Sequence, residues 1–209
     1  MAVSLQNEPA ARQARRDQDI LTARRIDWRF LLPNPELKQV LLVGAAESAL
    51  AAALERFCEA LTVVEPQRLN QEAASLPQPF DLVVVGAPDK ALIPRVLPLL
   101  KTGGTLYWEV QRNRKTLLRG NRKGYRNARR YAAYLQGLQL KEVDLHWHRP
   151  NFGGCLEIIP LNHSRALTHS LAKTHSSLKG KLKIAAGKTL RYSGLLPYTV
   201  SCFSLVGQK

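Results

Sequence analysis

The chain has 209 residues, a length that fits one domain of ordinary size, and its 45% hydrophobic content excludes a chain that is disordered throughout. It carries 31 Lys and Arg against 16 Asp and Glu, a formal charge of +15, so we expect anionic partners such as a phosphorylated or carboxylated small molecule, or nucleic acid. No apolar run approaches the roughly 20 residues that span a bilayer, and the polar N-terminus lacks the apolar core of a secretory signal. The cysteines are widely spaced (Cys58, Cys155 and Cys202), which indicates reduced thiols and a cytoplasmic protein.

The first 39 residues are expected to form an arm and a cap segment ahead of the main domain, which we place at 40–209. Basic and aromatic residues gather in the arm at 24–33, just before the first strand. Trp28 in this segment is a candidate substrate contact above the ligand cleft. The alternative is that Trp28 only covers the edge of the core, because aromatic side chains are commonly packing residues.

The segment from 40 to 66 is the most informative part of the chain. Val40–Val43 is apolar without alternation, as expected of a parallel strand that is covered on both faces. Gly44-Ala45-Ala46 then supplies a bend of small residues before a helix expected at 48–60, whose N-terminus would present unpaired N–H groups to a ligand. The next strand ends at Glu65, a carboxylate that can accept hydrogen bonds from the two hydroxyls of a ribose. The pattern predicts a nucleotide-binding βαβ unit.

Strand and helix patterns continue to alternate after this unit. A third strand is expected at 80–85 and is followed by Gly86-Ala87, which we place beside the same ligand. A helix is expected at 91–100 with a glycine stop at 101–104, and a fourth strand at 105–110. These connections favour a mostly parallel sheet.

The strongest electrostatic feature lies between 112 and 130, where nine Lys and Arg crowd together without an acid. Tyrosines interleave with these cations, and 124–139 has the composition of an amphipathic helix. Arg112 and Tyr125 are candidate substrate contacts. The alternatives are a solvated helix face that only keeps the protein soluble, and a surface that binds RNA.

A strand at 143–147 leads into a polar, glycine-containing stretch at 148–161, which we predict to be a substrate loop containing Asn151. His148 is a candidate catalytic base because histidine titrates near neutral pH, and strand alternation places His146 on the same face. A histidine held by structural hydrogen bonds is the alternative for both.

The C-terminal part carries no acid after Glu157. We expect helical segments at about 162–197, followed by a last strand at 199–206. The alternation of strands and helices predicts the α/β fold class. No metal site is expected, because the histidines of these helical segments are spaced six apart and do not share a helix face.

The segment from 40 to 206 resembles class I S-adenosylmethionine-dependent methyltransferases. Their first motif is a strand, Gly-x-Gly-x-Gly and, some twenty residues on, an acid. Gly44 fills the first glycine position, Ala46 and Ser48 stand at the second and third, and Leu42 stands where the family often has an acid. The resemblance implies a Rossmann-like doubly wound sheet that is mostly parallel, with an antiparallel last strand at 199–206 and a helical insertion at about 162–197 before that strand. It also implies S-adenosylmethionine as cofactor, held by residues of three strand ends: Gly44, Ala45, Ala46, Glu65, Gly86 and Ala87.

The resemblance further implies methyl transfer to oxygen or nitrogen of a small, anionic acceptor. Two alternatives stay open: a methyltransferase-like domain that has lost catalysis and binds a partner, and a protein that binds or methylates RNA through its basic stretch. Gly86-Ala87-Pro88-Asp89 stands where base-amine methyltransferases carry Asn/Asp-Pro-Pro-aromatic, which removes one RNA mechanism. The missing three-glycine fingerprint disfavours a dehydrogenase. The acceptor and the oligomeric state are not determined by the sequence.

Overall fold

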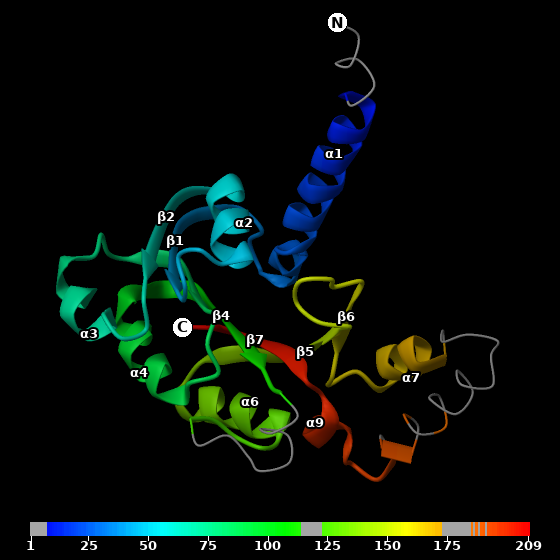
Figure 1. The fold of residues 1–209 in the computed structure, drawn as a ribbon. Helices are drawn as coiled ribbons and strands as arrows, with labels where there is room; N and C mark the ends of the chain where they lie inside the picture. Colours follow the sequence, from blue (N-terminus) through cyan, green and yellow to red (C-terminus); the bar gives the residue numbers. More distant parts are fainter. Residues whose placement is uncertain (1–7, 114–122, 173–184, 186, 188, 191) are drawn as a thin grey trace, which may run out of the picture.

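A seven-stranded sheet in the order β2-β1-β3-β4-β7-β5-β6 organises the molecule (Figure 1). The computed structural model describes residues 8–113, 123–172, 185, 187, 189, 190 and 192–209. The strands are β1 (Leu37–Val43), β2 (Cys58–Val64), β3 (Phe80–Val85), β4 (Leu100–Gln111), β5 (Lys141–Arg149), β6 (Glu157–Pro160) and β7 (Cys202–Gln208). Strands β2, β1, β3 and β4 pair in parallel, whereas β7 is antiparallel to both β4 and β5. The predicted fold class, including the antiparallel last strand, is confirmed.

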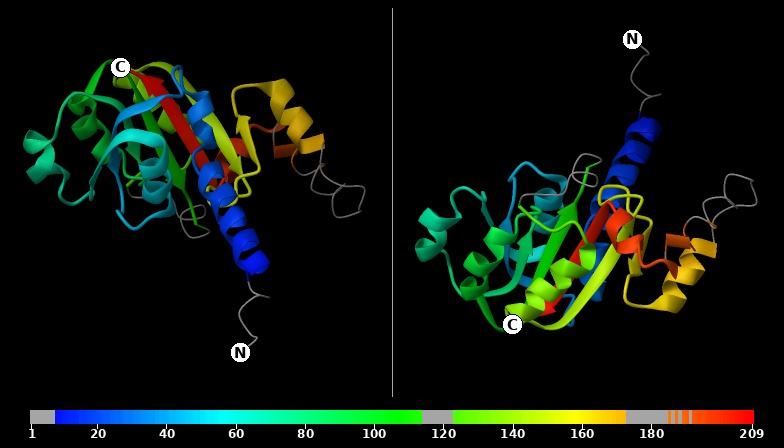
Figure 2. Two further views of the ribbon diagram at one scale, coloured as in Figure 1. Left: turned by 90° about the horizontal axis from the view of Figure 1, so that it is seen from above. Right: turned by 90° about the horizontal axis from the view of Figure 1, so that it is seen from below.

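Helices cover both faces of this sheet (Figures 1 and 2). The α-helices are α1 (Glu8–Arg24), α2 (Ala49–Phe57), α3 (Leu69–Glu72), α4 (Ile93–Val96), α6 (Ala128–Gly137), α7 (Ser164–Ala172) and α9 (Leu196–Thr199). The 3-10 helices are η1 (Asp27–Leu31), η2 (Ala73–Ser75), η3 (Lys90–Leu92) and η4 (Leu97–Leu99). One core lies between the sheet and α2 with η1, and the other lies between the sheet and α4, α6 and α9.

The unalternating apolar strands are explained by these two cores. In β1, Leu41 and Val43 pack into the core under α4 and α6, while Val40 and Leu42 pack into the core under α2. All four side chains are fully buried. Every position of such a strand faces apolar atoms, so a continuous apolar run is favoured over alternation.

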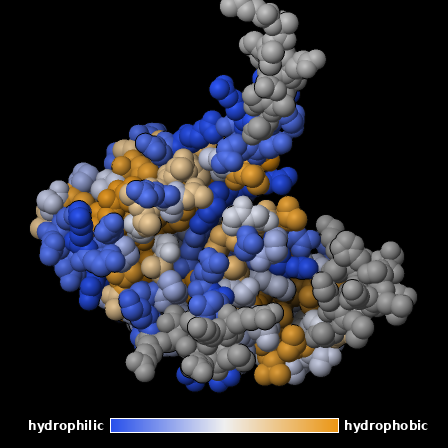
Figure 3. Space-filling view, in the orientation of Figure 1, coloured by the Kyte–Doolittle hydropathy of each residue, from blue (hydrophilic) through white to orange (hydrophobic). Residues whose placement is uncertain are grey.

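The N-terminal arm is joined to the main domain by its second half. Ile26 and Trp28 are fully buried beneath the sheet's α2 face, whereas α1 projects away from the sheet with a mostly hydrophilic surface (Figures 1 and 3). None of the helices in the described ranges combines the length and the apolar character that crossing a bilayer requires.

The structure corrects the expected helix at 91–100. This stretch forms three short pieces, η3, α4 and η4, with proline in the first turn of both α4 and η4. Proline lacks the N–H that a continuous helix needs, so the regular helix is interrupted. Strand β4 then begins at Leu100, and Gly103 with φ of 76° lies within the strand where the sequence predicted a helix stop.

The stretch at 148–161 is also more regular than predicted. Strand β5 continues to Arg149, and Glu157–Pro160 returns as the antiparallel strand β6 at the edge of the sheet. Only the segment between these two strands is a loop. The predicted insertion at 162–197 contains α7 and the start of α9, and most of 173–191 lies outside the described residues.

Candidate functional site

Two glycines lie side by side where the central parallel strands end. Val43 pairs with Val85, and Val85 pairs with Trp108, so the residues that follow them stand at one level. The ladder continues past the strands, because Gly44 N–H donates to Val64 O (3.0 Å) and Gly86 N–H donates to Val43 O (3.0 Å). A Cβ atom on Gly44 would lie 4.0 Å from Gly86 Cα, so side chains here would fill the space above this edge. We call Gly44 and Gly86 the glycine row.

The remaining predicted cofactor residues surround this row. Glu65 directly follows β2, is exposed, and has its Oε2 atom 3.9 Å from Arg68 Nε. The backbone turn at Ala45 and Ala46 is also exposed, and it leads to α2. Ser48 caps α2 by accepting a hydrogen bond from Ala51 N–H (3.1 Å), a role that glycine could not fill.

These residue types fit a cofactor that carries a ribose and an amino-acid group. The exposed carboxylate of Glu65 suits two hydroxyls, the first turn of α2 suits a carboxylate, and the glycine row permits close approach to the backbone. Ala46 adds only a methyl group where the family has glycine. The set of groups is therefore compatible with S-adenosylmethionine.

A strip of buried polar side chains lies farther across the sheet, at the same height along the strands as the glycine row. Glu109 stands one residue beyond Trp108, it pairs with Ser204 on β7, and Ser204 pairs with His146 on β5. Alternation adds Tyr107 and His148 on the same face. We call these five residues the polar strip, and each of them is less than 10% exposed.

The polar strip is held by strong internal contacts. Arg25 donates two hydrogen bonds to the Glu109 carboxylate, from Nη1 to Oε1 at 2.7 Å and from Nη2 to Oε2 at 2.6 Å. Burial lowers the pKa of Arg25, but the hydrogen bond and charge of Glu109 outweigh burial, so the net pKa is raised. His148 Nε2 lies 2.8 Å from Ser204 Oγ. The arm therefore provides the cation that neutralises the one acid of the strip.

The structure places Trp28 in the core instead of at an open cleft. Its ring stacks on Tyr107 with centroids 3.6 Å apart and an angle of 11° between the planes, and it is 2% exposed. This arrangement contradicts the prediction of a substrate contact and agrees with the packing alternative. Trp28 and Arg25 together cover the polar strip.

His148 does not have the properties of a base that meets a substrate. It is 1% exposed, and burial, together with the nearby His146 and Arg25, lowers its pKa to about 3. Its Nδ1 atom faces Cys155 Sγ at 3.6 Å, and Phe152 covers the ring at 4.7 Å between centroids. The predicted catalytic role is corrected to that of a neutral, hydrogen-bonded core residue.

Arg112 is also a structural residue, contrary to the prediction of a substrate contact. It is 4% exposed, and its guanidinium donates to the carbonyl groups of Arg126 (2.5 Å), Pro197 (3.2 Å) and Val200. Burial lowers the pKa of this guanidinium. The guanidinium also stands over the Phe203 ring at 5.0 Å. Arg112 thus joins the start of α6 to α9.

The two other predicted substrate contacts have local partners. Tyr125 is half-buried against Tyr131 and Tyr134, at 5.2 and 5.7 Å between ring centroids, and Lys90 Nζ lies 4.8 Å from its ring. Asn151 is exposed, and its Oδ1 accepts a hydrogen bond from Gly154 N–H (2.8 Å) within the loop after β5. A role in substrate binding stays a prediction for both.

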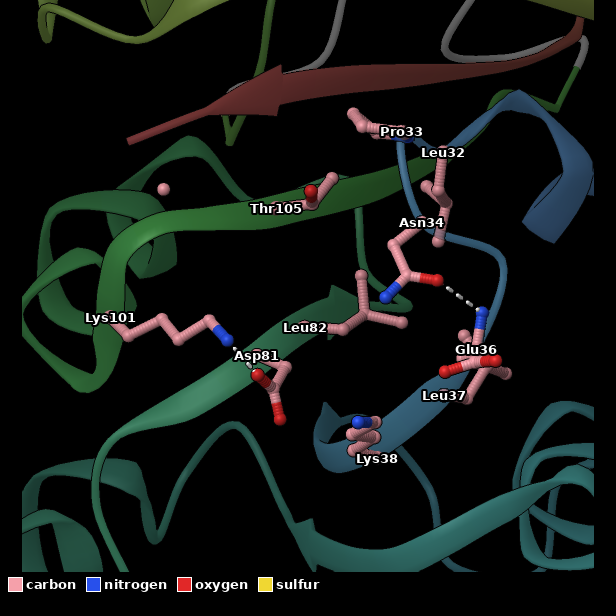
Figure 4. Close-up of a pocket in the computed structure, with 11 residues that line it drawn as sticks. Leu32, Pro33, Asn34, Glu36, Leu37, Lys38, Asp81, Leu82, Lys101 and Thr105 are labelled. Carbon is pink, nitrogen blue, oxygen red and sulfur yellow. Dashed lines mark hydrogen bonds and ion pairs between the residues drawn. The ribbon is translucent and has the colours of Figure 1, made fainter.

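Two of the hollows that described residues line lie near the sheet. A cavity of about 100 Å³ lies at the opposite edge from the glycine row, where Lys101 pairs with Asp81 and Asn34 accepts a hydrogen bond from Glu36 N–H (Figure 4). An open groove of about 420 Å³ lies between α2 and β2 and reaches Ala46. Only the second hollow borders the predicted cofactor turn.

Comparison with solved structures supports the interpretation of the fold. No protein-family model and no curated protein matches the sequence. The structure is similar to a SAM-dependent methyltransferase from Archaeoglobus fulgidus, with a TM-score of 0.50 and 12% identity over 92% of this chain and 94% of that one. Two further matches are the Haemonchus contortus phosphoethanolamine N-methyltransferase 2 with S-adenosyl-L-methionine (TM-score 0.43, 13% identity, 83% of this chain and 49% of that one) and the plantazolicin methyltransferase BpumL with SAH (0.44, 10%, 97% and 91%). The chain has the class I methyltransferase fold.

Sequence reasoning missed the polar strip except for its histidines. Glu109 gave one usable signal, because it is the one acid in the otherwise apolar stretch 105–110, and a buried acid needs a partner. Its partner Arg25 lies 84 residues away and carried no signal of its own.

Proposed function

We propose that the protein is an S-adenosylmethionine-dependent methyltransferase whose cofactor binds at the glycine row. The observation that supports this most directly is the placement of Gly44, Gly86 and Glu65 at the ends of three adjacent parallel strands in a methyltransferase fold. Glu65 would accept hydrogen bonds from the ribose hydroxyls, and the start of α2 would bind the amino-acid carboxylate. The bound cofactor would supply the methyl group of its sulfonium, and the rest of the cofactor would leave as a neutral thioether.

Methyl transfer of this kind needs alignment more than acid–base chemistry, so the absence of an exposed base at His148 is compatible with it. The residues of this chain would orient the acceptor and keep water away. The acceptor is proposed to be anionic and to offer oxygen or nitrogen, because the chain carries a charge of +15. The exposed cations at the start of α6 adjoin the loop after β3, since Lys90 N–H donates to Lys123 O (2.8 Å).

Calorimetric titration with S-adenosylmethionine tests the proposal, using wild type, Glu65→Ala and the matched control Glu59→Ala. Glu59 is an exposed acid of β2, the strand that Glu65 follows, and it stands six residues before Glu65. We expect micromolar binding that weakens at least tenfold in Glu65→Ala, since two charge-assisted hydrogen bonds are lost, and that is unchanged in Glu59→Ala. No heat at several temperatures, together with no thermal shift, would reject the cofactor site.

A second candidate is a methyltransferase-like protein that binds a partner without catalysis. It is favoured by the use of Ser48 as a helix cap where the family has glycine, and by the closure of the polar strip beneath Arg25 and Trp28. The same titration distinguishes the candidates, because only the first requires the cofactor.

A further inference from the structure

The exposed face of α6 and the neighbouring α9 form a basic surface that methyl transfer itself does not require. We propose that this surface, made by Arg126, Arg129, Arg130 and Tyr198, binds single-stranded nucleic acid. We call it the α6–α9 surface. Binding of nucleic acid to the α6–α9 surface does not require the cofactor, so the inference goes beyond the proposed function and can be tested separately.

The charges of the surface are not balanced by nearby acids. Arg126, Arg129 and Arg130 are exposed, and no ion pair joins them to any residue that the structure describes. Both contributing helices also come from acid-free stretches, because no Asp or Glu stands at 110–141 or at 158–209. A surface cation without a partner can contact a phosphate without first breaking an ion pair. Such a surface therefore favours binding of a polyanion.

The fold fixes the direction of these arginines. Asn127 caps α6 by accepting a hydrogen bond from Arg129 N–H (2.8 Å), and Ala128, Tyr131 and Leu135 are fully buried. Because these buried positions define the inner face of the helix, Arg129 and Arg130 are directed to solvent. The cations are therefore presented by a rigid element.

The buried Arg112 joins the two parts of the surface. Its guanidinium donates to the carbonyl of Arg126 on one side and, on the other, to the carbonyls of Pro197 in α9 and of Val200 directly after it. Tyr198 of α9 is 40% exposed, so the helix that Arg112 joins to the cations carries an exposed aromatic ring. Proteins that bind single-stranded nucleic acid without sequence preference combine two elements. Cations contact the phosphate backbone, and an aromatic ring stacks on a base.

The α6–α9 surface also adjoins the proposed cofactor site. The loop after β3 is tied to the segment before α6, because Lys90 N–H donates to Lys123 O (2.8 Å), and Tyr134 OH donates to Lys90 O (3.1 Å). This loop begins at Gly86 of the glycine row. A nucleic-acid strand bound to α6 would therefore pass beside the edge of the sheet where the methyl donor is proposed to lie.

Fluorescence anisotropy with a labelled 15-nucleotide oligouridine and the matching oligodeoxythymidine tests the inference. The test variant is Arg126→Gln/Arg129→Gln/Arg130→Gln, and the control is Lys38→Gln/Lys141→Gln/Arg16→Gln, which removes equal charge at the opposite sheet edge and on α1. We expect both strands to bind wild type and control equally. The test variant should bind at least tenfold more weakly and its log–log salt slope should be smaller by about 2, since each phosphate contact contributes about 0.7.

A second variant tests the stacking element. Tyr198→Ala should weaken binding about tenfold without changing the salt slope, because stacking is not electrostatic. Far-UV circular dichroism and titration with S-adenosylmethionine show that each variant is folded. Equal loss of binding in the test and control triples would overturn the inference and assign binding to net charge. Binding to vesicles of phosphatidylserine without binding to either strand would also overturn it, in favour of a membrane surface.

The two proposals fail in different ways. If oligonucleotides bind and S-adenosylmethionine does not, the proposed function falls and the α6–α9 surface stands. If S-adenosylmethionine binds and the oligonucleotides do not, the surface falls and the proposed function stands.

Discussion

The ion pair between Arg25 and Glu109 should contribute more to stability than any exposed ion pair of the protein. Its side chains are 10% and 6% exposed, and both terminal guanidinium nitrogens, Nη1 and Nη2, donate to the carboxylate. Arg25→Ala would leave the Glu109 carboxyl in the core without its cation. Removing one partner of a buried pair costs about 3–5 kcal/mol, because the remaining charge is no longer compensated.

For a chain of this size, a loss of that magnitude should lower the melting temperature by roughly 6–20 °C, at about 2–4 °C per kcal/mol. Urea denaturation followed by circular dichroism would measure the change in unfolding free energy. Arg56→Ala is the control. Its pair with Asp19 has the same 2.6 Å distance, but its side chains are 55% and 57% exposed, so we expect a loss of at most about 0.5 kcal/mol.

A neutral pair separates charge from packing. Arg25→Met/Glu109→Gln keeps most of the buried volume and leaves no charge in the core, so it should recover more than half of the stability lost in Arg25→Ala. If Arg25→Ala loses no more than Arg56→Ala, the arm does not close the polar strip in solution and the buried contact described above is refuted.

Three further predictions concern single positions. Gly44→Ala should reduce S-adenosylmethionine affinity at least tenfold in calorimetry while changing stability by less than about 1 kcal/mol, because the added Cβ makes only ordinary contacts with Leu42 and lies in the space proposed for the cofactor. His148 has a folded pKa of about 3 against 6.5 in the unfolded chain, so its contribution to stability is complete above pH 6.5 and is lost as the pH falls toward 3. Relative to His148→Gln, the wild type should lose about 2 kcal/mol in urea titrations between pH 7.5 and pH 5, and parallel pH profiles would contradict the assignment. Gly104→Ala should destabilise by about 1–3 kcal/mol in the same assay, since its Cβ would meet Leu100 at 2.9 Å and a backbone oxygen at 3.0 Å; a neutral result would show that β4 shifts freely.

The central sheet could be predicted because its signals are local. The apolar strand, the small-residue bend and the following helix occupy consecutive residues, and burial on both faces removes the alternation that would otherwise appear. The prolines in the first turns of α4 and η4 were also visible in the sequence, and they explain why the helix expected at 91–100 is broken. The residues of β1, α2 and β3 therefore carry enough local information to predict these three elements.

The polar strip could not be predicted because its members come from three strands that are far apart in the sequence, and the cation that pairs with Glu109 comes from the arm. Glu109, Ser204 and His146 meet only when β7 inserts between β4 and β5, a pairing that joins residues about 60 to 95 positions apart. The sequence shows His148 as a titratable residue, whereas the structure shows why it does not titrate near neutrality. Burial, which sets its pKa, is a property of the assembled sheet.

The arginine-rich stretch also shows that composition alone does not predict which side chains are buried. Composition treats Arg112 and Arg126 as equivalent cations, yet the first is buried and the second is exposed. Arg112 follows the last residue of β4 and is buried, and its two terminal guanidinium nitrogens donate to backbone carbonyls, one of which is the carbonyl of Arg126. Arg112→Ala should therefore weaken oligonucleotide binding although Arg112 is only 4% exposed, because the substitution would release the start of α6 from α9. Anisotropy at low salt would show this loss alongside unchanged binding of S-adenosylmethionine, and unchanged strand binding would show that the two helices need no common anchor.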